Sequence, residues 1–559
     1  MDFKKELARI LKKQVNADVE SLLEVPPDAS LGDLALPCFT LAKVMKQSPQ
    51  QIAQSLSQKI KVSFIERIEV KGAYLNFFLN KGVSARAVLE EVLKKKEKYG
   101  HSTLGKGKTI VIDMSSPNIA KPFGIGHLRS TIIGNALHHL LITQGYKVIR
   151  VNHLGDWGTQ FGKLITAYKK WGKKTELMKD PIKYLLKLYV KFHEEAEKND
   201  SFEDEARAWF KKLEDGNKEA MQLWKTFREL SLKEFKKIYH MLNVDFESYE
   251  GEAFYNKKMN TVLKELEAKH LLEESEGAHI VNLEKYDLTS AIIKKKDGAT
   301  VYITRDLAAA IYRKKTYKAD KLLYEVGSEQ KLHFQQLFKI LELMGYAWAK
   351  DCVHITHGLY LDQDRKKLAT RKGKTVFMED IMTEAIDLAK KIIREKNPTL
   401  KNKDKVAEAV GVGAIIFNDL SNDRNNDIIF DMDKFLSFEG ETGPYLQYTH
   451  ARLCSILRKA STVKKIKEYD VYDQEEHQLI KHLGQFPQAL EEAMLHYKPS
   501  IVTRYLLDLA QRTNTYYVTH PILKATEPTR SARLMLVRAV QTVLQQGLLL
   551  LNMKPLEEM

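Results

Sequence analysis

Cysteine is scarce in this sequence. Three cysteines occur among 559 residues, Cys38, Cys352 and Cys454, and no two of them form a CxxC pair. This spacing excludes a disulfide framework and a cysteine-based zinc site. Free cysteines that are few and scattered are typical of a reducing compartment, so we expect a cytoplasmic protein.

Long apolar runs are absent as well. No run approaches the ~20 residues that a membrane-spanning helix needs, and the N-terminus has no apolar signal-peptide core. The first segment, 1–15, has the apolar spacing of an amphipathic helix, but Asp2 and Glu6 argue against a targeting peptide. We therefore expect the first helix of a folded domain and no membrane partner.

Positive charge is in excess. Lys and Arg total 89 against 73 Asp and Glu, a formal net charge of +16 that is spread along the chain. A diffuse positive field favours a polyanionic partner, nucleic acid first and an anionic membrane surface second. Hydrophobic residues make up 44% of the 559 residues, which is ordinary for a globular protein. A chain of this length divides into about three or four domains.

One segment has the pattern of a strand, a loop, a helix and a second strand. The β-branched run 109–112 predicts a buried strand, and Pro117 and Pro122 bracket the loop that follows it. Apolar residues then recur at helical spacing, which places His127 in the first turn of a helix, and 148–151 predicts the next strand. We expect a βαβ unit whose first loop opens at the carboxyl edge of a parallel sheet.

The loop of this unit is a candidate anion site. A helix N-terminus presents unpaired N–H groups and a partial positive charge, so phosphate groups bind there readily. Two familiar phosphate motifs are excluded. Ser102 replaces the first glycine of a P-loop ending at 107–109, and Arg129 replaces the third glycine of a dinucleotide fingerprint starting at Gly124. The residues alone leave a second interpretation open, a tight connection that binds nothing.

The rest of the chain divides by its hydrophobic pattern. The N-terminal part combines a helix with strand-like alternation at 73–78, which predicts a small α+β domain, and 161–269 is helical and highly charged. Strand signals return at 300–303, 322–324 and 353–355. From about residue 435 the pattern is helical throughout. We therefore expect a helical insertion that divides a parallel-sheet domain, followed by a helical bundle.

Three stretches carry a family resemblance. They are 115–131, which reads SSPNIAKPFGIGHLRST, 152–162, which reads NHLGDWGTQFG, and 443–448, which reads GPYLQY and is followed by Ala451-Arg452-Leu453. The first closely resembles the HIGH region of class I aminoacyl-tRNA synthetases in its arginyl-tRNA synthetase form, and the others resemble motifs of that family in the expected order. The resemblance runs from Gly32-Asp33 to Ala532-Arg533-Leu534, almost the whole chain.

Pattern and resemblance together predict a multidomain α/β protein. We expect an N-terminal α+β tRNA-binding domain at 1–104, a class I Rossmann-type catalytic domain at 105–375 with a helical insertion at about 165–285, a connecting helical segment at 376–435 and an all-α anticodon-binding bundle at 436–559.

The resemblance assigns the first loop to ATP. It implies that adenine lies against the backbone at Gly126, that His127 reaches the phosphates, and that Phe123 and Gly124 line the same site. Gly124 stands where the family's motif usually has its first histidine. We expect Lys121 to replace that donor as the cation that stabilises the phosphates.

A second signature of the family is a lysine-rich loop. Here it follows Gly358-Leu359, which we also assign to ATP, and reads KKLATRKG at 366–373, with Thr370 where the second lysine is usual. By resemblance, Lys367 and Arg371 neutralise the departing pyrophosphate. The pattern alone equally describes a solvated basic loop.

The amino-acid site follows from the resemblance as well. Tyr302, Asp306 and Gln330 are implied to hold the arginine side chain, and Asp113 and Asn118 its ammonium and carboxylate end. A planar guanidinium needs fork-shaped acceptors and a counter-charge, which a carboxylate supplies. Without the resemblance, a Tyr and an Asp beside Arg305 would equally describe a structural ion pair.

The implied activity is that of an arginine–tRNA ligase. Such an enzyme activates L-arginine with ATP to arginyl-adenylate and transfers it to the 2′-hydroxyl of the terminal adenosine of tRNA(Arg), releasing AMP and pyrophosphate. We expect Mg²⁺ as the ATP counter-ion, without a dedicated carboxylate cage, and a monomer. Candidate phosphate contacts for the tRNA are Arg452, Arg458, Lys459, Lys464 and Lys465, although a solvated helix face explains these five residues equally well.

Two rival functions stay open at this stage. One is a class I synthetase for another amino acid, which Asp306 disfavours because an acidic pocket suits a cationic substrate. The other is a catalytically inactive tRNA-binding paralogue, in which Gly124 and Thr370 would record lost catalysis. Release of pyrophosphate that depends on arginine and tRNA separates all three.

Overall fold

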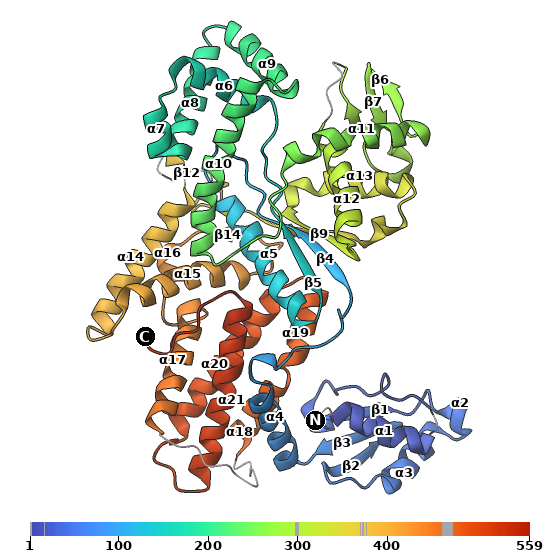
Figure 1. The fold of residues 1–559 in the computed structure, drawn as a ribbon. Helices are drawn as coiled ribbons and strands as arrows, with labels where there is room; N and C mark the ends of the chain where they lie inside the picture. Colours follow the sequence, from blue (N-terminus) through green and yellow to red (C-terminus); the bar gives the residue numbers. More distant parts are fainter. Residues whose placement is uncertain are drawn as a thin grey trace.

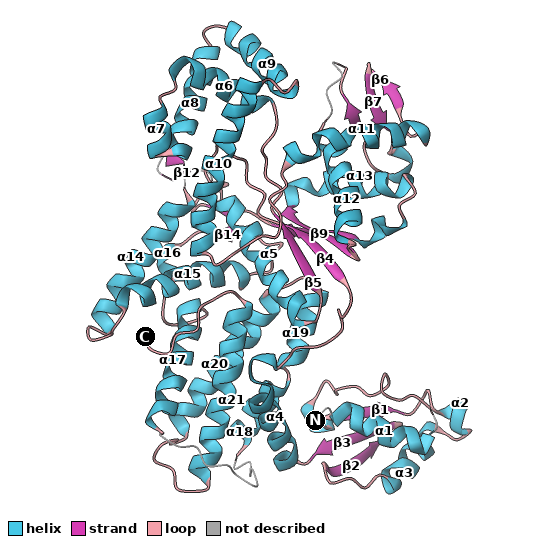
Figure 2. Ribbon diagram, in the orientation of Figure 1, coloured by secondary structure: helices cyan, strands magenta, loops and turns pink. Residues whose placement is uncertain are grey.

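The fold was analysed in a computed structural model. It describes residues 3–15, 17–296, 301–368, 370–371, 374–375, 377–460 and 473–559. Figure 1 shows the chain as an elongated molecule, with a small N-terminal sheet at one end, a parallel sheet near the middle and helices between and around them. Figure 2 shows that helices dominate every part except the two sheets and a small third sheet.

The N-terminal part is an α+β unit with its own core, as predicted. Helix α1 (Phe3–Val15), the short α2 (Ala42–Met45) and α3 (Pro49–Lys59) accompany three antiparallel strands. The strands are β1 (Leu34–Pro37), β2 (Ile65–Lys71) and β3 (Tyr74–Leu79), in the order β1-β3-β2. Ser48 caps α3 in a capping box ahead of Pro49, a favourable first helical residue. Leu11, Leu56 and Phe77 belong to one buried cluster confined to this unit.

Helix α4 (Lys81–Lys95) packs elsewhere. Its buried residues Leu89 and Val92 belong to the large central core, and it contacts α18 (Gln474–Gly484) and α21 (Thr529–Leu550). The Tyr99 hydroxyl, just beyond it, donates a 3.0 Å hydrogen bond to the Leu483 carbonyl. The segment after the N-terminal sheet therefore anchors that sheet to the C-terminal helices.

The parallel sheet confirms four predicted strand positions. Its order is β10-β9-β4-β5, and every pair is parallel. The strands are β4 (Thr109–Asp113), β5 (Lys147–Val151), β9 (Lys321–Gly327) and β10 (Cys352–His357). Helix α5 (Ile125–Thr143) connects β4 to β5 and contains His127 in its first turn. From β4 the chain continues to β5 on one side of the sheet, and from β9 it continues to β10 on the other side. The strand order therefore reverses between β4 and β9, and ligands of open α/β sheets bind at such a point.

The strand predicted at 300–303 is wrong. Residue 300 lies outside the described residues, and helix α12 (Tyr302–Tyr317) begins where the strand was expected. The β-branched run is too short to outweigh the strong helix formers after it, including Ala308 to Ala310. Thr304 also fixes the first turn, because its hydroxyl donates a 2.6 Å hydrogen bond to the Ile293 carbonyl.

The insertion between β5 and β9 has two parts. The first is helical, as predicted, and comprises α6 (Thr159–Trp171), α7 (Lys174–Lys179), α8 (Pro181–Ala196), α9 (Ser201–Glu214), α10 (Lys218–Met241) and α11 (Glu252–Ala268). The second is an antiparallel sheet that the sequence pattern did not indicate, of β6 (Glu273–Ser275), β7 (Ala278–Val281) and β8 (Ala291–Lys294). These strands have three or four residues each, too few to show a period.

The C-terminal part is helical, as predicted. It comprises α14 (Met378–Lys396), α15 (Lys403–Leu420), α16 (Met432–Phe435), α17 (Gly443–Lys459), α18, α19 (Phe486–Leu495), α20 (Ser500–Thr519) and α21. Leu536, Val540 and Leu544 of α21 are fully or almost fully buried. Lys481 of α18 bonds Asp33 of the N-terminal unit at 2.8 Å, which ties the two ends of the chain together. Among the described helices, none combines the length and the apolar character needed to cross a bilayer.

Candidate active site

The loop between β4 and α5 is held in an unusual backbone conformation. Three residues with side chains, Ser115, Ser116 and Ala120, have positive φ angles of 71°, 49° and 59°. Such conformations persist only where the surroundings enforce them, and they cluster at functional sites. Here Ser130 accepts a hydrogen bond from the Ser115 N–H at 2.9 Å, and Ser231 accepts one from the Ala120 N–H at the same distance.

The start of α5 exposes backbone to open space. A Cβ atom placed on Gly124 or on Gly126 would meet no atom within 4 Å. In contrast, a Cβ on Gly134, further along the same helix, would lie 2.5 Å from Met114. Steric need for packing therefore explains Gly134 but not the two glycines of the loop, which leave room for a flat group against the backbone.

His127, in the first turn of α5, is a neutral imidazole. Its Nδ1 accepts a 3.2 Å hydrogen bond from the Gly124 N–H, so the ring hydrogen is on Nε2. Burial lowers the pKa of His127 to about 4, and the positive charge of Lys121 acts in the same direction. At neutral pH, His127 is therefore a hydrogen-bond donor without a charge.

Lys121 and Phe123 of this loop have different surroundings. The Lys121 ammonium is 5.7 Å from the ring centre of Tyr189 on α8 and close enough to His127 to influence its pKa. Phe123 is only 3% exposed, and its ring packs edge-on against Tyr239 at 5.6 Å between centroids. The phenyl ring of Phe123 therefore supports the loop from the core side.

The lysine-rich loop contacts the turn after β9. The Lys367 ammonium bonds Glu329 at 3.0 Å, and both side chains are more than half exposed. Arg371 belongs to the two-residue strand β12 (Thr370–Arg371), but its side chain lies outside the described residues. The neighbouring Leu368 is 7% exposed and anchors the start of the loop.

Gly358 and Leu359 are engaged within the protein. A Cβ on Gly358 would lie 2.6 Å from the Asn426 carbonyl oxygen, so the close approach of that segment requires glycine. The Gly358 N–H donates to the Arg424 carbonyl, and the Leu359 N–H donates to Asp427 at 2.7 Å. Their backbone donors are therefore occupied by protein acceptors in this conformation.

Asp306 is ionised inside a cluster of basic groups. Burial tends to raise the pKa of its carboxyl, but the hydrogen bond and charge of His333, with His153 and Arg313, hold the pKa below its usual value. The His333 Nε2 lies 2.7 Å from one carboxylate oxygen, and the His153 Nε2 lies 3.6 Å from the other. The carboxylate is thus a negative group at the start of α12, next to the sheet's reversal point.

Three other predicted arginine-binding residues, Tyr302, Gln330 and Asn118, are exposed. Tyr302, one helical turn before Asp306, is 61% exposed. Gln330 ends the short helix η4 (Ser328–Gln330) and is exposed, as is Asn118, which pairs with Gly155 in an isolated parallel bridge. These residues present polar groups towards solvent, where a ligand can reach them.

Asp113 is already paired. Its carboxylate accepts a 2.7 Å hydrogen bond from buried Arg313 and a 2.8 Å bond from the Ser116 hydroxyl. The Arg313 guanidinium also lies 3.1 Å from the His153 Nδ1. One network therefore connects the end of β4 with the carboxylate of Asp306 on α12.

Three members of this network were missed by the sequence analysis. They are His153, Arg313 and His333. His153 lies within the motif 152–162, so its position was indicated but its role was not. Arg313 follows Asp306 by seven residues, which is two helical turns on the same face, and this spacing was available in the sequence. No local pattern distinguishes His333, because its contact with Asp306 depends on how α12 and α13 (Lys331–Leu343) pack.

A buried ion pair connects α5 to the C-terminal helices. The Arg129 guanidinium of α5 is 3.3 Å from Asp419 of α15, and the Tyr360 hydroxyl donates to the same carboxylate at 2.6 Å. Burial raises the pKa of Asp419, and the charge of Arg129 opposes the shift. Because removing one partner of a buried pair leaves an uncompensated charge, this ion pair fixes α5 against the C-terminal helices.

Comparisons with known proteins agree over the whole chain. Three family models match it: "tRNA synthetases class I (R), catalytic domain" at residues 88–432, "DALR anticodon binding domain" at 446–559 and "Arginyl tRNA synthetase N terminal domain" at 1–79. An arginine–tRNA ligase of Enterococcus faecalis is 53% identical over 557 residues, which is 99% of each chain. One of Halothermothrix orenii is 50% identical over 566 aligned positions, with full coverage of both chains.

Solved structures show the same architecture. Thermus thermophilus arginyl-tRNA synthetase superposes with a TM-score of 0.80 at 26% identity, over 99% of this chain and 100% of that one. The Plasmodium falciparum arginyl-tRNA synthetase shares the fold, with a TM-score of 0.79 at 23% identity and 99% coverage of both chains. The identities over the full length leave no support for the two rival functions. The chain belongs to the arginine–tRNA ligases, the ATP-dependent class I aminoacyl-tRNA synthetases specific for arginine.

Proposed function

We propose that the crevice between β4 and β9 holds ATP over Gly124 and Gly126 and holds arginine beside Asp306. The observation that carries this proposal is the ionised Asp306 carboxylate, which lies at the sheet's reversal point with an exposed Tyr302 one turn away. The arginine carboxylate then attacks the α-phosphorus of ATP in line. A P–O bond to arginine forms, the bond to the bridging oxygen breaks, and pyrophosphate leaves.

On the ATP side, the residues act by position and charge. His127 donates its Nε2 hydrogen to a phosphate oxygen, and Lys121 neutralises charge that develops on the phosphates. Lys367 and Arg371 bind the departing pyrophosphate, which requires Lys367 to leave its exposed pairing with Glu329. Phe123, Gly358 and Leu359 shape the site through packing and backbone contacts.

On the arginine side, a fork of acceptors faces the guanidinium. Asp306 supplies the counter-charge, and Tyr302 and Gln330 supply neutral hydrogen-bonding groups. Asp113 and Asn118 receive the ammonium and carboxylate end, and Arg313 holds the Asp113 carboxylate in place by its 2.7 Å bond. Lysine would leave part of the fork unpaired, so the site rejects it.

In the second step, the terminal adenosine of tRNA(Arg) enters the crevice. Its 2′-hydroxyl attacks the arginyl carbonyl carbon, and AMP leaves with the electrons of the acyl–phosphate bond. Away from the crevice, Arg452 of α17 lies between the exposed rings of Tyr448 and Tyr517, at 4.8 and 5.4 Å from their centres. Exposed aromatic rings beside a guanidinium suit unstacked anticodon bases. The candidates Lys464 and Lys465 lie outside the described residues.

Mg²⁺ enters as the counter-ion of ATP. Among the described residues, no group of three or more His, Cys, Asp or Glu side chains could hold a metal ion. No step above is routed through the ion. We further propose that the enzyme acts as a monomer in the cytoplasm.

Pyrophosphate release tests the function directly. We expect release that requires arginine and tRNA(Arg) together with ATP, and arginyl-tRNA as the product. The assay includes lysine in place of arginine, and tRNA without arginine, as controls. Release with another amino acid, or none with arginine, would contradict the proposed function.

A further inference from the structure

A cavity of about 1060 Å³ lies at the other end of α5, away from the ATP loop. Its walls come from five parts of the chain: the end of α4 with the residues just after it, the second half of α5, the end of α10 with the residues just after it, helix α15, and α21 with the C-terminal tail. His139 of α5 lines it, twelve residues after His127, which is roughly 18 Å along a helix that rises ~1.5 Å per residue. The cavity is therefore separate from the crevice that holds ATP and arginine.

Cations outnumber carboxylates around this cavity. Lys96, Lys405, Arg538 and Lys554 line it, against Glu97 and Glu408. Within the described part of the chain, none of these six groups forms an ion pair. Four cations against two carboxylates, with no ion pair among the six, favour an anion that bears more than one negative charge.

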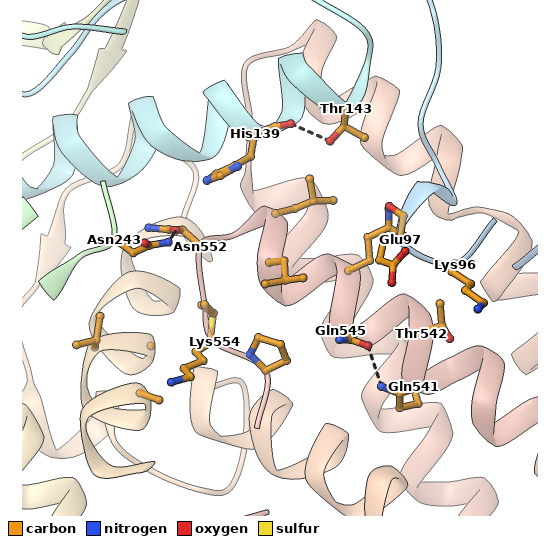
Figure 3. Close-up of a pocket in the computed structure, with 18 of the residues that line it drawn as sticks. Lys96, Glu97, His139, Thr143, Asn243, Gln541, Thr542, Gln545, Asn552 and Lys554 are labelled. Carbon is orange, nitrogen blue, oxygen red and sulfur yellow. Dashed lines mark hydrogen bonds between the residues drawn. The ribbon is translucent and has the colours of Figure 1, made fainter. Parts of the chain in front are cut away.

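The walls also contain apolar and amide groups. Ile142 is 45% exposed and Leu549 is 47% exposed, although both are large apolar side chains. Figure 3 shows Asn243 and Asn552 on one side of the space and Gln545, Thr542 and Glu97 on the other. Asn552 accepts a 3.1 Å bond from the Asn243 amide, and Gln545 accepts a 3.0 Å bond from Gln541.

Some amide atoms of the walls have no hydrogen-bond partner among the described residues, and two of them matter here. They are the Asn243 Oδ1 acceptor and the Gln545 Nε2 donor, whose companion atoms form the bonds just described. An acceptor and a donor fixed in this way match the edge of a nucleic-acid base. The two carboxylates can accept hydrogen bonds from ribose hydroxyls.

We propose that this cavity is a second ligand site, specific for a free nucleoside phosphate. The phosphate lies against the lysines and Arg538, and the base lies between Ile142 and Leu549. Pockets of ~300–1,000 Å³ with mixed apolar and polar walls are typical small-molecule sites, and this cavity is at the upper end. A bound nucleotide would connect α5, whose first turn holds His127, with α21 of the C-terminal bundle.

Binding to the full-length chain tests the proposal. The catalytic crevice is first saturated with a non-hydrolysable arginyl-adenylate analogue, and AMP and GMP are then titrated by calorimetry. We expect one further nucleotide per chain. Arg538→Glu and Lys554→Glu should each weaken it by about tenfold or more, because each reverses one charge–phosphate contact. Arg504→Glu, an exposed change on α20 outside the cavity, serves as the matched control.

The results that would overturn the proposal are distinct. The proposal is wrong if neither AMP nor GMP binds the saturated enzyme at millimolar concentration. It is also wrong if a nucleotide binds but both charge reversals leave its affinity unchanged. If inorganic phosphate binds as tightly as AMP, the cavity binds phosphate alone and does not recognise a nucleoside. If the two charge reversals weaken tRNA binding while no mononucleotide binds, an RNA occupies the cavity instead. Circular dichroism checks that the exposed substitutions leave the fold intact, and arginylation without nucleotide is measured separately, so a failure here leaves the ligase function untouched.

Discussion

The two halves of the proposed crevice, named here the ATP half and the arginine half, are built differently. The ATP half consists of open backbone at Gly124 and Gly126, with its cations supplied by separate segments. The arginine half is an interlocked network, in which Asp306 is bonded to His333 and is linked through His153 and Arg313 to Asp113. In the proposed crevice, phosphate binding therefore depends on side chains from separate segments that come together around the ligand. The choice of amino acid depends instead on charged side chains that the protein already holds in place.

The strongest test of this contrast is Asp306→Asn. A neutral amide removes the counter-charge but keeps the shape, so we expect kcat/KM for arginine to fall by roughly 10³- to 10⁴-fold, as for other sites that lose a buried pairing group. The KM for ATP should change far less, because within the described part of the chain none of the proposed ATP-binding side chains bonds Asp306 itself. Pyrophosphate exchange with each substrate varied in turn measures both. Asp387→Asn, an exposed carboxylate on α14, is the control, and equal losses for arginine and ATP would refute the separation of the halves.

A smaller effect is expected in the ATP half from Lys121→Ala. Loss of one charge-stabilising group reduces rates by on the order of 10² to 10³, and less where other cations compensate. Single-turnover formation of arginyl-adenylate at saturating arginine measures it. Lys106→Ala, an exposed lysine in the loop before β4, should leave the rate unchanged. A Lys121→Ala enzyme with the normal rate would mean that Lys367 and Arg371 carry the charge alone.

His333→Ala tests whether the arginine half depends on its fixed charges. His333 holds the pKa of Asp306 below its usual value, so the carboxylate stays ionised as the pH falls until that lowered pKa is reached. Without His333 the pKa rises, because burial is less opposed, and arginine binding is lost at a higher pH. We expect the acidic limb of kcat/KM for arginine to move upward, with a loss of about tenfold for each pKa unit on that limb. An unshifted limb, with a uniformly raised KM, would indicate a purely steric role.

The two halves also differ in how far the sequence predicted them. The strands of the parallel sheet, the start of α5 and the place of His127 follow from local periodicity, and the structure has them where expected. Tyr302 and Asp306 lie one turn apart on α12, and this helix begins where the sequence predicted a strand. Local sequence patterns were therefore enough to predict the position of a residue wherever a single helix or strand determines it.

The network around Asp306 could not be predicted in the same way. His333 reaches Asp306 only because α12 and α13 pack together, and Arg313 reaches Asp113 only because α12 packs near β4. The spacing along the chain places Arg313 and Asp306 on one helix face, but it does not indicate these contacts between elements. The positive φ angles of Ser115, Ser116 and Ala120 were also invisible, because serine and alanine carry no signal for such conformations. The strands β6, β7 and β8 were not predicted because they are too short to show an alternating pattern.

The smallest expected effect concerns the contact that joins the two halves. Lys367 of the ATP half bonds Glu329, which precedes Gln330 of the arginine half, and both side chains are largely exposed. Exposed pairs contribute ~0.2–1 kcal/mol, so releasing Lys367 by Glu329→Gln should raise the rate of adenylate formation by no more than about fivefold. Glu342→Gln, which removes a similar exposed pair with Lys339, should do nothing. A higher rate of adenylate formation would show that Lys367 must leave Glu329 before it can bind phosphate. This outcome is expected if the ATP half comes together only around its ligand. A fall would show instead that Glu329 positions Lys367 for catalysis, and the ATP half would then be prearranged like its neighbour.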